Sequence, residues 1–440
     1  MTETIKDLSE QGVLALSARA GEPEWLRDLR QEAFKAFSDL DWPDRRVGED
    51  WRYTDPARFD LARPILDSGT AAPAVESALI AAVDDRAGSI RIIDGGVTAA
   101  TVCAEAAERG VIVSDLAVAA GEHPDLVRAA LGTAVGTDEK FAALNLAAFT
   151  AGAFVHVPAE VELDEPLTVT VQAAAPGAAL PRVLVVLGHN AKATVYVDHV
   201  GDAAQTVVEV VEVVVGEGAL ANVVTAQDWG GHVDHIAAHT GLVHSNGDYR
   251  HFEITLGGRT VYVRPDLKLD HRGGNGELLG VYFCDEGQHV EHRSLIHHNA
   301  SHTSSNLLYK GALQGECRAT FFGNIRIEPH AKATSSDQTN RNLILTDRAK
   351  ADSIPFLEIE NSDVVRCGHH SSIGQVDELQ LFYLEARGIP RPEAARLLVF
   401  GFFGEVTDRV DLPGVRETVL GEVEREILSG PTTLMHQRRT

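Results

Sequence analysis

The 440-residue sequence has little cysteine and no cysteine motif. Its four cysteines, at positions 103, 284, 317 and 367, lie far apart, and no Cys-x-x-Cys pair occurs. Disulfide frameworks, zinc fingers and ferredoxin-type sites depend on closely spaced cysteines, so the sequence argues against all three. A metal held by this chain would need ligands from distant segments or from another chain, and we take Cys103, Cys284 and Cys317 to be structural.

The sequence also lacks long apolar runs, an excess of basic charge and many aromatic residues. No run approaches the length of about 20 residues that crosses a bilayer, and no signal peptide opens the chain, so we expect a cytoplasmic protein without membrane contact. Acidic residues outnumber basic ones by 64 to 39, for a formal net charge of −25, which disfavours nucleic acid as a partner. Aromatic residues make up only 6%, and no convincing carboxylate pair occurs, which disfavours a carbohydrate-active enzyme.

Nucleophile and phosphate-binding motifs are missing as well. The sequence contains no Gly-x-Ser-x-Gly, no Gly-x-x-x-x-Gly-Lys-Ser/Thr and no Gly-x-Gly-x-x-Gly after an expected strand. We therefore expect a chain that does not bind or hydrolyse ATP and has no catalytic residue.

Three segments differ in composition, and we expect them to be three domains. Residues 1–137 are rich in Ala, Leu and Glu at helical spacing, as in 24–37, and predict a helical domain. Residues 138–374 contain short alternating runs of Val, Ile, Thr and Tyr between turn residues, and predict strands. Residues 375–440 return to helix, with Gly388 closing one helix and Pro392 opening the next.

The strand region repeats itself loosely. Segments 246–254 and 275–283 stand 29 residues apart, and each begins with Asn-Gly followed by an alternating strand. A regular advance of turn and strand favours a β-solenoid, in which each coil covers the apolar edge of the last. A β-sandwich with evenly spaced strands is the alternative.

Two groups of residues could carry metal chemistry. Cys367 and His369 would point to the same side of an extended strand, as a thiolate and an imidazole suited to iron or zinc. A buried cysteine beside a hydrogen-bonded histidine is the alternative.

Five histidines also lie close together in the sequence, namely His289, His292, His297, His298 and His302. Several of them would fall on opposite faces of a strand. Solvated or hydrogen-bonded side chains are therefore the better interpretation of this group than a metal site.

Several motifs resemble the SufB/SufD family of iron–sulfur cluster assembly scaffolds. Segments 333–345, 351–359 and 367–369, followed by 377–388, match the family in order and spacing. The SufD branch is indicated by Lys-Gly-Ala-Leu from Lys310, by Glu-Asp-Trp-Arg-Tyr-Thr at 49–54, and by 141–145 leading to 155–158.

The resemblance implies a mainly β fold, with a right-handed parallel β-helix between two helical domains. It implies a scaffold that pairs with a SufB-like chain through the β-helices, binds a SufC-like ATPase through its C-terminal helices, and assembles a transient cluster or iron at the junction. Reduced flavin is associated with such complexes, but no residue here matches a flavin site. A homodimer of the isolated chain stays open, as do the cluster type and its ligands.

The resemblance also points to particular residues. It implies a cluster-assembly or metal site at His369 and Cys367. His370 is a secondary candidate, because its imidazole should point to the opposite face of the strand. The segment His370-Ser-Ser-Ile-Gly departs from the family's usual Gly-Ala-Thr-Val-Gly. The alternatives are a SufB-like paralogue and a β-helix carbohydrate-active or metal-dependent enzyme. The apolar residues of the C-terminal helices could be core or ATPase-docking side chains: Leu381, Leu384, Leu397, Leu398, Phe400, Phe402 and Phe403.

Overall fold

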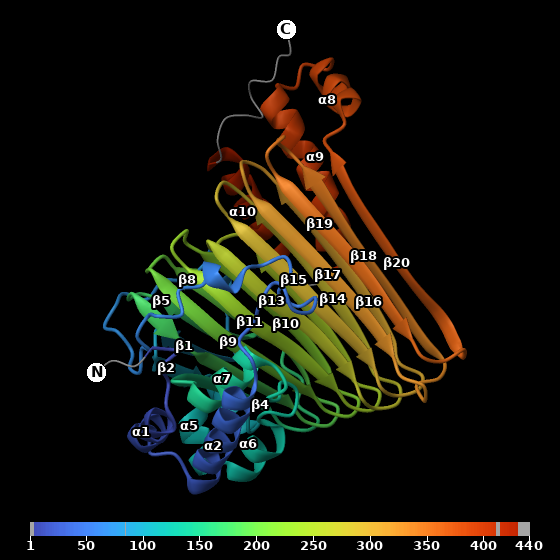
Figure 1. The fold of residues 1–440 in the computed structure, drawn as a ribbon. Coiled ribbons are helices and arrows are strands. Elements are labelled where there is room, and N and C mark those ends of the chain that lie inside the picture. The colour runs from blue at the N-terminus through green and yellow to red at the C-terminus, as the bar shows by residue number, and fades with distance from the viewer. Residues whose placement is uncertain (1–3, 84, 411–413, 430–440) are drawn as a thin grey trace.

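A computed structural model describes residues 4–83, 85–410 and 414–429. Its centre is a parallel β-solenoid whose strands stack in two sheets around a shared apolar core, with helices at its N-terminal and C-terminal parts (Figure 1). The expected solenoid is confirmed, and the β-sandwich is not the fold. The two sheets are called the first and second sheet below.

The first sheet contains ten strands in the order β2 (Gly96–Val102), β1 (Gly88–Ile93), β5 (Leu167–Ala173), β8 (Lys192–Gly201), β10 (Leu220–Trp229), β12 (Asp248–Thr255), β14 (Asn275–Cys284), β16 (Ser304–Leu313), β18 (Thr334–Ile344) and β20 (Val364–Gln375). The second sheet runs β19 (Lys350–Ile359), β17 (Arg318–Ile327), β15 (His289–His298), β13 (Thr260–Leu269), β11 (Asp234–Val243), β9 (Gln205–Val215), β7 (Pro181–Leu187), β4 (Ala151–Val157) and β3 (Ile112–Asp115), with β6 (Gly177–Ala179) beside β9. Neighbouring strands are parallel except for the pairs β1–β2 and β3–β4.

One corner of the solenoid is a ladder of left-handed residues. They recur at intervals of 27 to 31 residues, at Glu160, Asn190, Gly218, Asn246, Gly273, His302 and Ala333. Each backbone N–H of this ladder donates to a carbonyl in the next coil, as from Asn246 to Arg272 at 3.1 Å. The ladder explains the repeat in the sequence, with one difference: Asn275 begins β14, and the turn before it lies at Gly273.

Glycines inside the solenoid make room for tyrosine rings from neighbouring coils. A Cβ atom on Gly311 would lie 2.0 Å from the ring of Tyr282, and one on Gly280 would lie 2.3 Å from the ring of Tyr309. These close approaches exclude any larger side chain and lock adjacent coils in register.

The N-terminal helices cover the outer face of the second sheet. Apolar residues of α2 (Glu24–Asp39) and α7 (Lys140–Ala148) share a core with Leu184 and Ile236 of the sheet. The other helices here are α1 (Glu10–Ala20), η1 (Pro56–Arg58), α3 (Ala78–Ala81), α4 (Ala104–Glu108), α5 (Leu116–Glu122) and α6 (Pro124–Ala130). Strands β1, β2 and β3 also lie within residues 1–137, where the composition predicted mostly helix.

The C-terminal helices cover the outer face of the first sheet. They are α8 (Glu378–Glu385), α9 (Arg391–Thr407) and α10 (Val415–Ser429). Phe403 of α9 packs with Phe252 and Leu279 of the sheet, and Lys310 of β16 donates to the carbonyl of Phe402 at 2.7 Å. Within the described ranges, no helix is long and apolar enough to cross a membrane.

Candidate functional site

The solenoid is open at its C-terminal end. Strands β20 and β19 are the last strands of the two sheets, and neither has a strand partner on its outer edge among the described residues (Figure 1). Large apolar side chains are exposed there, including Ile359 and Ile373 at 42% and 48%. Unpaired backbone groups and exposed apolar side chains on an edge strand are features of a surface that pairs with another chain.

Cys367 and His369 lie on β20 at this open end. Their parallel partners on β18 are Ser336 and Gln338, both buried inside the solenoid, so the two side chains lie on the inward-facing side of the last coil. Cys367 is half-buried against the core, and His369 is exposed. Burial raises the pKa of the Cys367 thiol, and nearby Asp337 adds to this effect. Metal binding at Cys367 would therefore release a proton.

His370 lies on the other side of β20. Its Nε2 atom is 3.6 Å from a carboxylate oxygen of Asp337, which also accepts a hydrogen bond from Arg366 at 3.0 Å. His370 therefore lies beside an outer-surface acid, and it does not join Cys367 and His369 on the inward side.

The apolar residues of the C-terminal helices divide by exposure. Leu381 and Phe403 are buried within this chain. Four others are half-buried: Leu384, Leu398, Phe400 and Phe402. Leu397 is exposed, together with three residues that the sequence analysis did not single out, Leu379, Phe382 and Tyr383. These four side chains form the exposed apolar part of the C-terminal helices.

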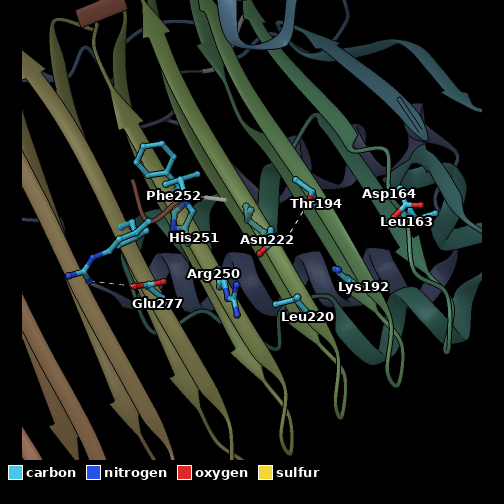
Figure 2. Close-up of a pocket in the computed structure, with 14 residues that line it drawn as sticks. Leu163, Asp164, Lys192, Thr194, Leu220, Asn222, Arg250, His251, Phe252 and Glu277 are labelled. Carbon is cyan, nitrogen blue, oxygen red and sulfur yellow. Dashed lines mark hydrogen bonds and ion pairs between the residues drawn. The ribbon is translucent and has the colours of Figure 1, made fainter. Parts of the chain in front are cut away.

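A pocket of about 270 Å³ lies on the outer face of the first sheet, across β8, β10, β12 and β14 (Figure 2). Lys192, Arg250 and Glu277 line it, and an ion pair of 3.7 Å joins Glu277 to Arg409. Strands β16 and β18 separate this pocket from β20. The pocket is therefore not part of the Cys367–His369 site.

The segment 49–54 is seated on the second sheet. Trp51 stacks on Tyr262 with ring centres 4.2 Å apart, and Asp50 accepts a hydrogen bond from Arg293 at 3.0 Å. The Thr54 hydroxyl donates to the buried carboxylate of Glu291. The segment thus fastens the N-terminal part of the chain to β13 and β15.

The Glu291 carboxylate should make stability depend on pH. Burial raises its pKa to about 7 from an ordinary value of 4.5. The folded state therefore binds the Glu291 proton more tightly than the unfolded state does. The stabilisation that this proton gives the folded state is complete below pH 4.5 and is lost as the pH rises through 7. The parent chain should therefore be more stable at pH 5 than at pH 8 by an amount to which Glu291 contributes about 1–3 kcal/mol. We expect Glu291→Gln to lack this contribution, as measured by the free energy of urea unfolding at the two pH values.

The control for that experiment is Glu316→Gln, at a side chain that is 66% exposed. This variant should keep the pH dependence of the parent chain. An unchanged difference in the Glu291→Gln variant would contradict the assignment of the proton to Glu291.

A group of buried ionisable residues inside the solenoid was missed in the sequence. His199 of β8, Glu209 of β9, and His235 and His239 of β11 all point inward and are at most 3% exposed. The ligand atoms of His199, Glu209 and His239 lie within 4.8 Å of one another. Two signals could have found them. Glu209 interrupts a run of valines, and His235 and His239 share one side of one strand.

Comparison with known proteins identifies the family. The family described as "SUF system FeS cluster assembly, SufBD core domain" matches residues 169–402, and "SufBD protein N-terminal region" matches 84–169. This chain belongs to the SufBD family. The resemblance in its sequence is thereby confirmed, and the chain is a SufBD-family protein of iron–sulfur cluster assembly.

Three relatives show how far the similarity extends. An iron-sulfur cluster assembly SufBD family protein of Mycobacterium leprae is 38% identical over 303 residues, covering 66% of this chain and 75% of the relative. The iron-sulfur cluster assembly protein SufD of Bacillus subtilis is 28% identical over 443 residues, covering 96% and 99%. A SufBD family protein of Staphylococcus epidermidis is 27% identical over 433 residues, covering 92% and 90%.

Proposed function

We propose that this chain is a SufD-like, non-catalytic scaffold subunit of a cytoplasmic complex with a SufB-like chain and a SufC-like ATPase. The observation that carries the proposal is the open end of the solenoid, where unpaired strand edges and exposed apolar residues surround Cys367 and His369. A SufB-like chain would add its own strands to this end. The iron–sulfur cluster, as cargo, would then form between ligands of both chains.

Cys367 and His369 would each supply one soft or borderline ligand to that cargo. Two ligands hold a cluster weakly, which suits a site that must release its product. The partner would complete the coordination. Reduced flavin, where it takes part, belongs in this proposal to the complex and not to residues of this chain.

The SufC-like ATPase would dock on the exposed apolar side chains of the C-terminal helices, Leu379, Phe382, Tyr383 and Leu397. Helix α9 is anchored to β16 through Lys310, which is hydrogen-bonded to Phe402 and ion-paired with Glu405. ATP-driven movement of the helices would reach the solenoid through this contact. It would shift the junction and open Cys367 and His369 to iron and sulfide.

The decisive test is anaerobic co-expression of this chain with the SufB-like and SufC-like proteins of the same organism, with purification on this chain. We expect both partners to co-purify with visible iron–sulfur absorption. His369→Ala should retain both partners and lose most of the cluster, at least about tenfold by iron and sulfide content, because an essential ligand is removed.

His370→Ala is the matched control, since this neighbouring imidazole lies on the outer side of the same strand. Its complex should keep the cluster of the parent chain. A full cluster yield in the His369→Ala complex, or the absence of both partners from the parent chain, would contradict the proposal.

A further inference from the structure

Three imidazoles converge on one carboxylate oxygen inside the solenoid. The Nε2 atoms of His199, His235 and His239 lie 2.7, 3.2 and 3.2 Å from Oε2 of Glu209. Trp229 packs beside His199 and His235, with ring centres 5.5 and 5.7 Å away. The group lies in β8, β9 and β11, far along both sheets from β20. It is therefore separate from Cys367 and His369.

In His199 and His235, the ring nitrogen that faces away from Glu209 is Nδ1, and its hydrogen bond shows that this nitrogen carries a proton. Nδ1 of His199 faces the carbonyl of Ala226 at 3.1 Å and can only donate to it. Nδ1 of His235 faces Oε1 of Gln227 at 3.0 Å, and the Gln227 amide nitrogen donates to Gly257, so this Nδ1 also donates. Both neutral rings consequently present a bare Nε2 lone pair to Glu209.

Two lone pairs facing a carboxylate oxygen repel unless a cation lies between them. The cation is either a proton on each ring or one metal ion shared by all. Two other buried atoms of the group have no hydrogen-bond partner among the described residues. They are Oε1 of Glu209 and Nδ1 of His239. The nearest further charge is Glu253, with a carboxylate oxygen 3.6 Å from that Nδ1. Unmatched polar atoms at full burial are costly and indicate a missing ligand.

The spacing of the donor atoms is close to that around a bound metal ion. Ligand bonds of 2.0–2.1 Å to a tetrahedral ion place neighbouring ligand atoms about 3.3 Å apart. The Nε2 atoms of His235 and His239 lie 3.2 Å from Glu209 Oε2, close to that value, whereas the His199 Nε2 atom is nearer, at 2.7 Å, and would move outward on binding. The Nδ1–H bonds to Ala226 and Gln227 are the outer-shell contacts that orient metal-bound histidines in proteins.

We propose that the solenoid interior holds one divalent first-row metal ion, Fe²⁺ or Zn²⁺, bound by His199, Glu209 and His239, whose ligand atoms lie within 4.8 Å of one another. His235, with its Nε2 atom 3.2 Å from Glu209 Oε2, turns toward them and supplies the fourth ligand. Three imidazole nitrogens and one carboxylate oxygen suit both ions, whereas sulfur takes no part. The site is closed and four-coordinate, as structural metal sites are. It would tie β8 of the first sheet to β9 and β11 of the second sheet across the lumen, and so fasten the two sheets together.

The test begins with the full chain expressed in minimal medium supplemented with Co²⁺, which substitutes for either ion and reports its geometry by visible absorption. We expect one Co²⁺ per chain after EDTA treatment and gel filtration, with the strong d–d bands of a four-coordinate site. X-ray absorption should show nitrogen and oxygen ligands without sulfur. Metal analysis of the chain from unsupplemented cells then tells Fe²⁺ from Zn²⁺.

Ligand variants locate the ion. Glu209→Gln and His239→Gln should each weaken Co²⁺ binding by at least about 100-fold, beyond the 10–100-fold typical of an outer-shell change. Gln227→Leu removes the acceptor that orients His235, and should weaken binding about 10–100-fold while leaving all four ligands in place.

His298→Gln is the matched control, because this equally buried histidine is bonded only to the hydroxyls of Thr303 and Ser305. It should bind Co²⁺ as the parent chain does, and so should a Cys367→Ser/His369→Ala chain. Should the ligand variants fail to fold, the absorption spectrum of the parent chain decides. No bound metal, a sulfur ligand, or full binding by a folded His239→Gln chain would overturn the proposal.

Discussion

Glu212→Leu should lower the stability of the folded chain by about 3–5 kcal/mol, more than any other single change considered above. Glu212 of β9 and Arg182 of β7 form an ion pair in which both side chains are 0% exposed. Glu212 also accepts hydrogen bonds from the backbone N–H groups of Gly132 and Val135, each at 3.0 Å. Replacement by leucine would leave a buried guanidinium without its countercharge and two N–H groups without an acceptor.

The same ion pair joins the N-terminal helices to the solenoid. Arg182 donates to Asn145 of α7 at 2.8 Å, and Asn145 in turn donates to the carbonyls of Pro181 and Val208. Burial lowers the pKa of Arg182, so the cation depends on Glu212 for compensation. The loss should therefore appear as early separation of the helices from the second sheet.

Urea unfolding at pH 7, followed by circular dichroism, measures the effect. The double variant Arg182→Leu/Glu212→Leu should recover part of the loss, because the isolated charge is gone. Glu316→Leu, which breaks an ion pair that is more than 60% exposed on both sides, should change stability by no more than about 0.5 kcal/mol. A Glu212→Leu chain within 1 kcal/mol of the parent would show that the pair is not a structural anchor.

The second large effect concerns the open end of the solenoid. Ile359→Glu/Ile373→Glu should abolish co-purification of the SufB-like chain while the chain itself still folds. Both side chains are already partly exposed, at 42% and 48%, so the isolated chain tolerates a carboxylate there. In the proposed junction each carboxylate would be buried without a partner, at a cost of about 2–3 kcal/mol or more, which weakens binding at least about 100-fold.

Val118→Glu provides the comparison, since Val118 is similarly exposed at 49% but lies on α5 (Leu116–Glu122), away from β19 and β20. This variant should retain the SufB-like chain. The SufC-like ATPase should stay bound to both variants, because it docks on the C-terminal helices in the proposed complex. Retention of the SufB-like chain by the double glutamate variant would place the junction elsewhere.

The sequence predicted the solenoid because its strands carry a local signal. Val-rich alternation and turn residues at nearly even intervals are visible within about 30 residues, and each coil repeats them. In β1 the alternation is present but short, with Ile90 and Ile92 separated by Arg91, and the Ala-rich residues around it predicted helix. Strand β2 contains two alanines and is largely exposed, so its pairing with β1 determines its structure more than its composition does.

The placement of Cys367 and His369 on one side of a strand followed from the period of two, but the interior group around Glu209 did not. Its members come from three strands in two sheets, and only the path of the chain around the corners brings them together. Helix α9 shows a different limit. It is apolar on nearly every side, so its sequence could not tell buried Phe403 from exposed Leu397.

The two ends of the solenoid differ in strand direction, and this difference affects how two solenoids can join. At the N-terminal end, β2 and β3 run antiparallel to their neighbours, so a coil added there would not continue the parallel order of the solenoid. Among the strands that the structure describes, β19 and β20 are the terminal ones that run parallel to their neighbours. A head-to-tail stack of solenoids would therefore interrupt the run of parallel strands at every junction, whereas a pair joined through β19 and β20 would meet at two ends of the same kind.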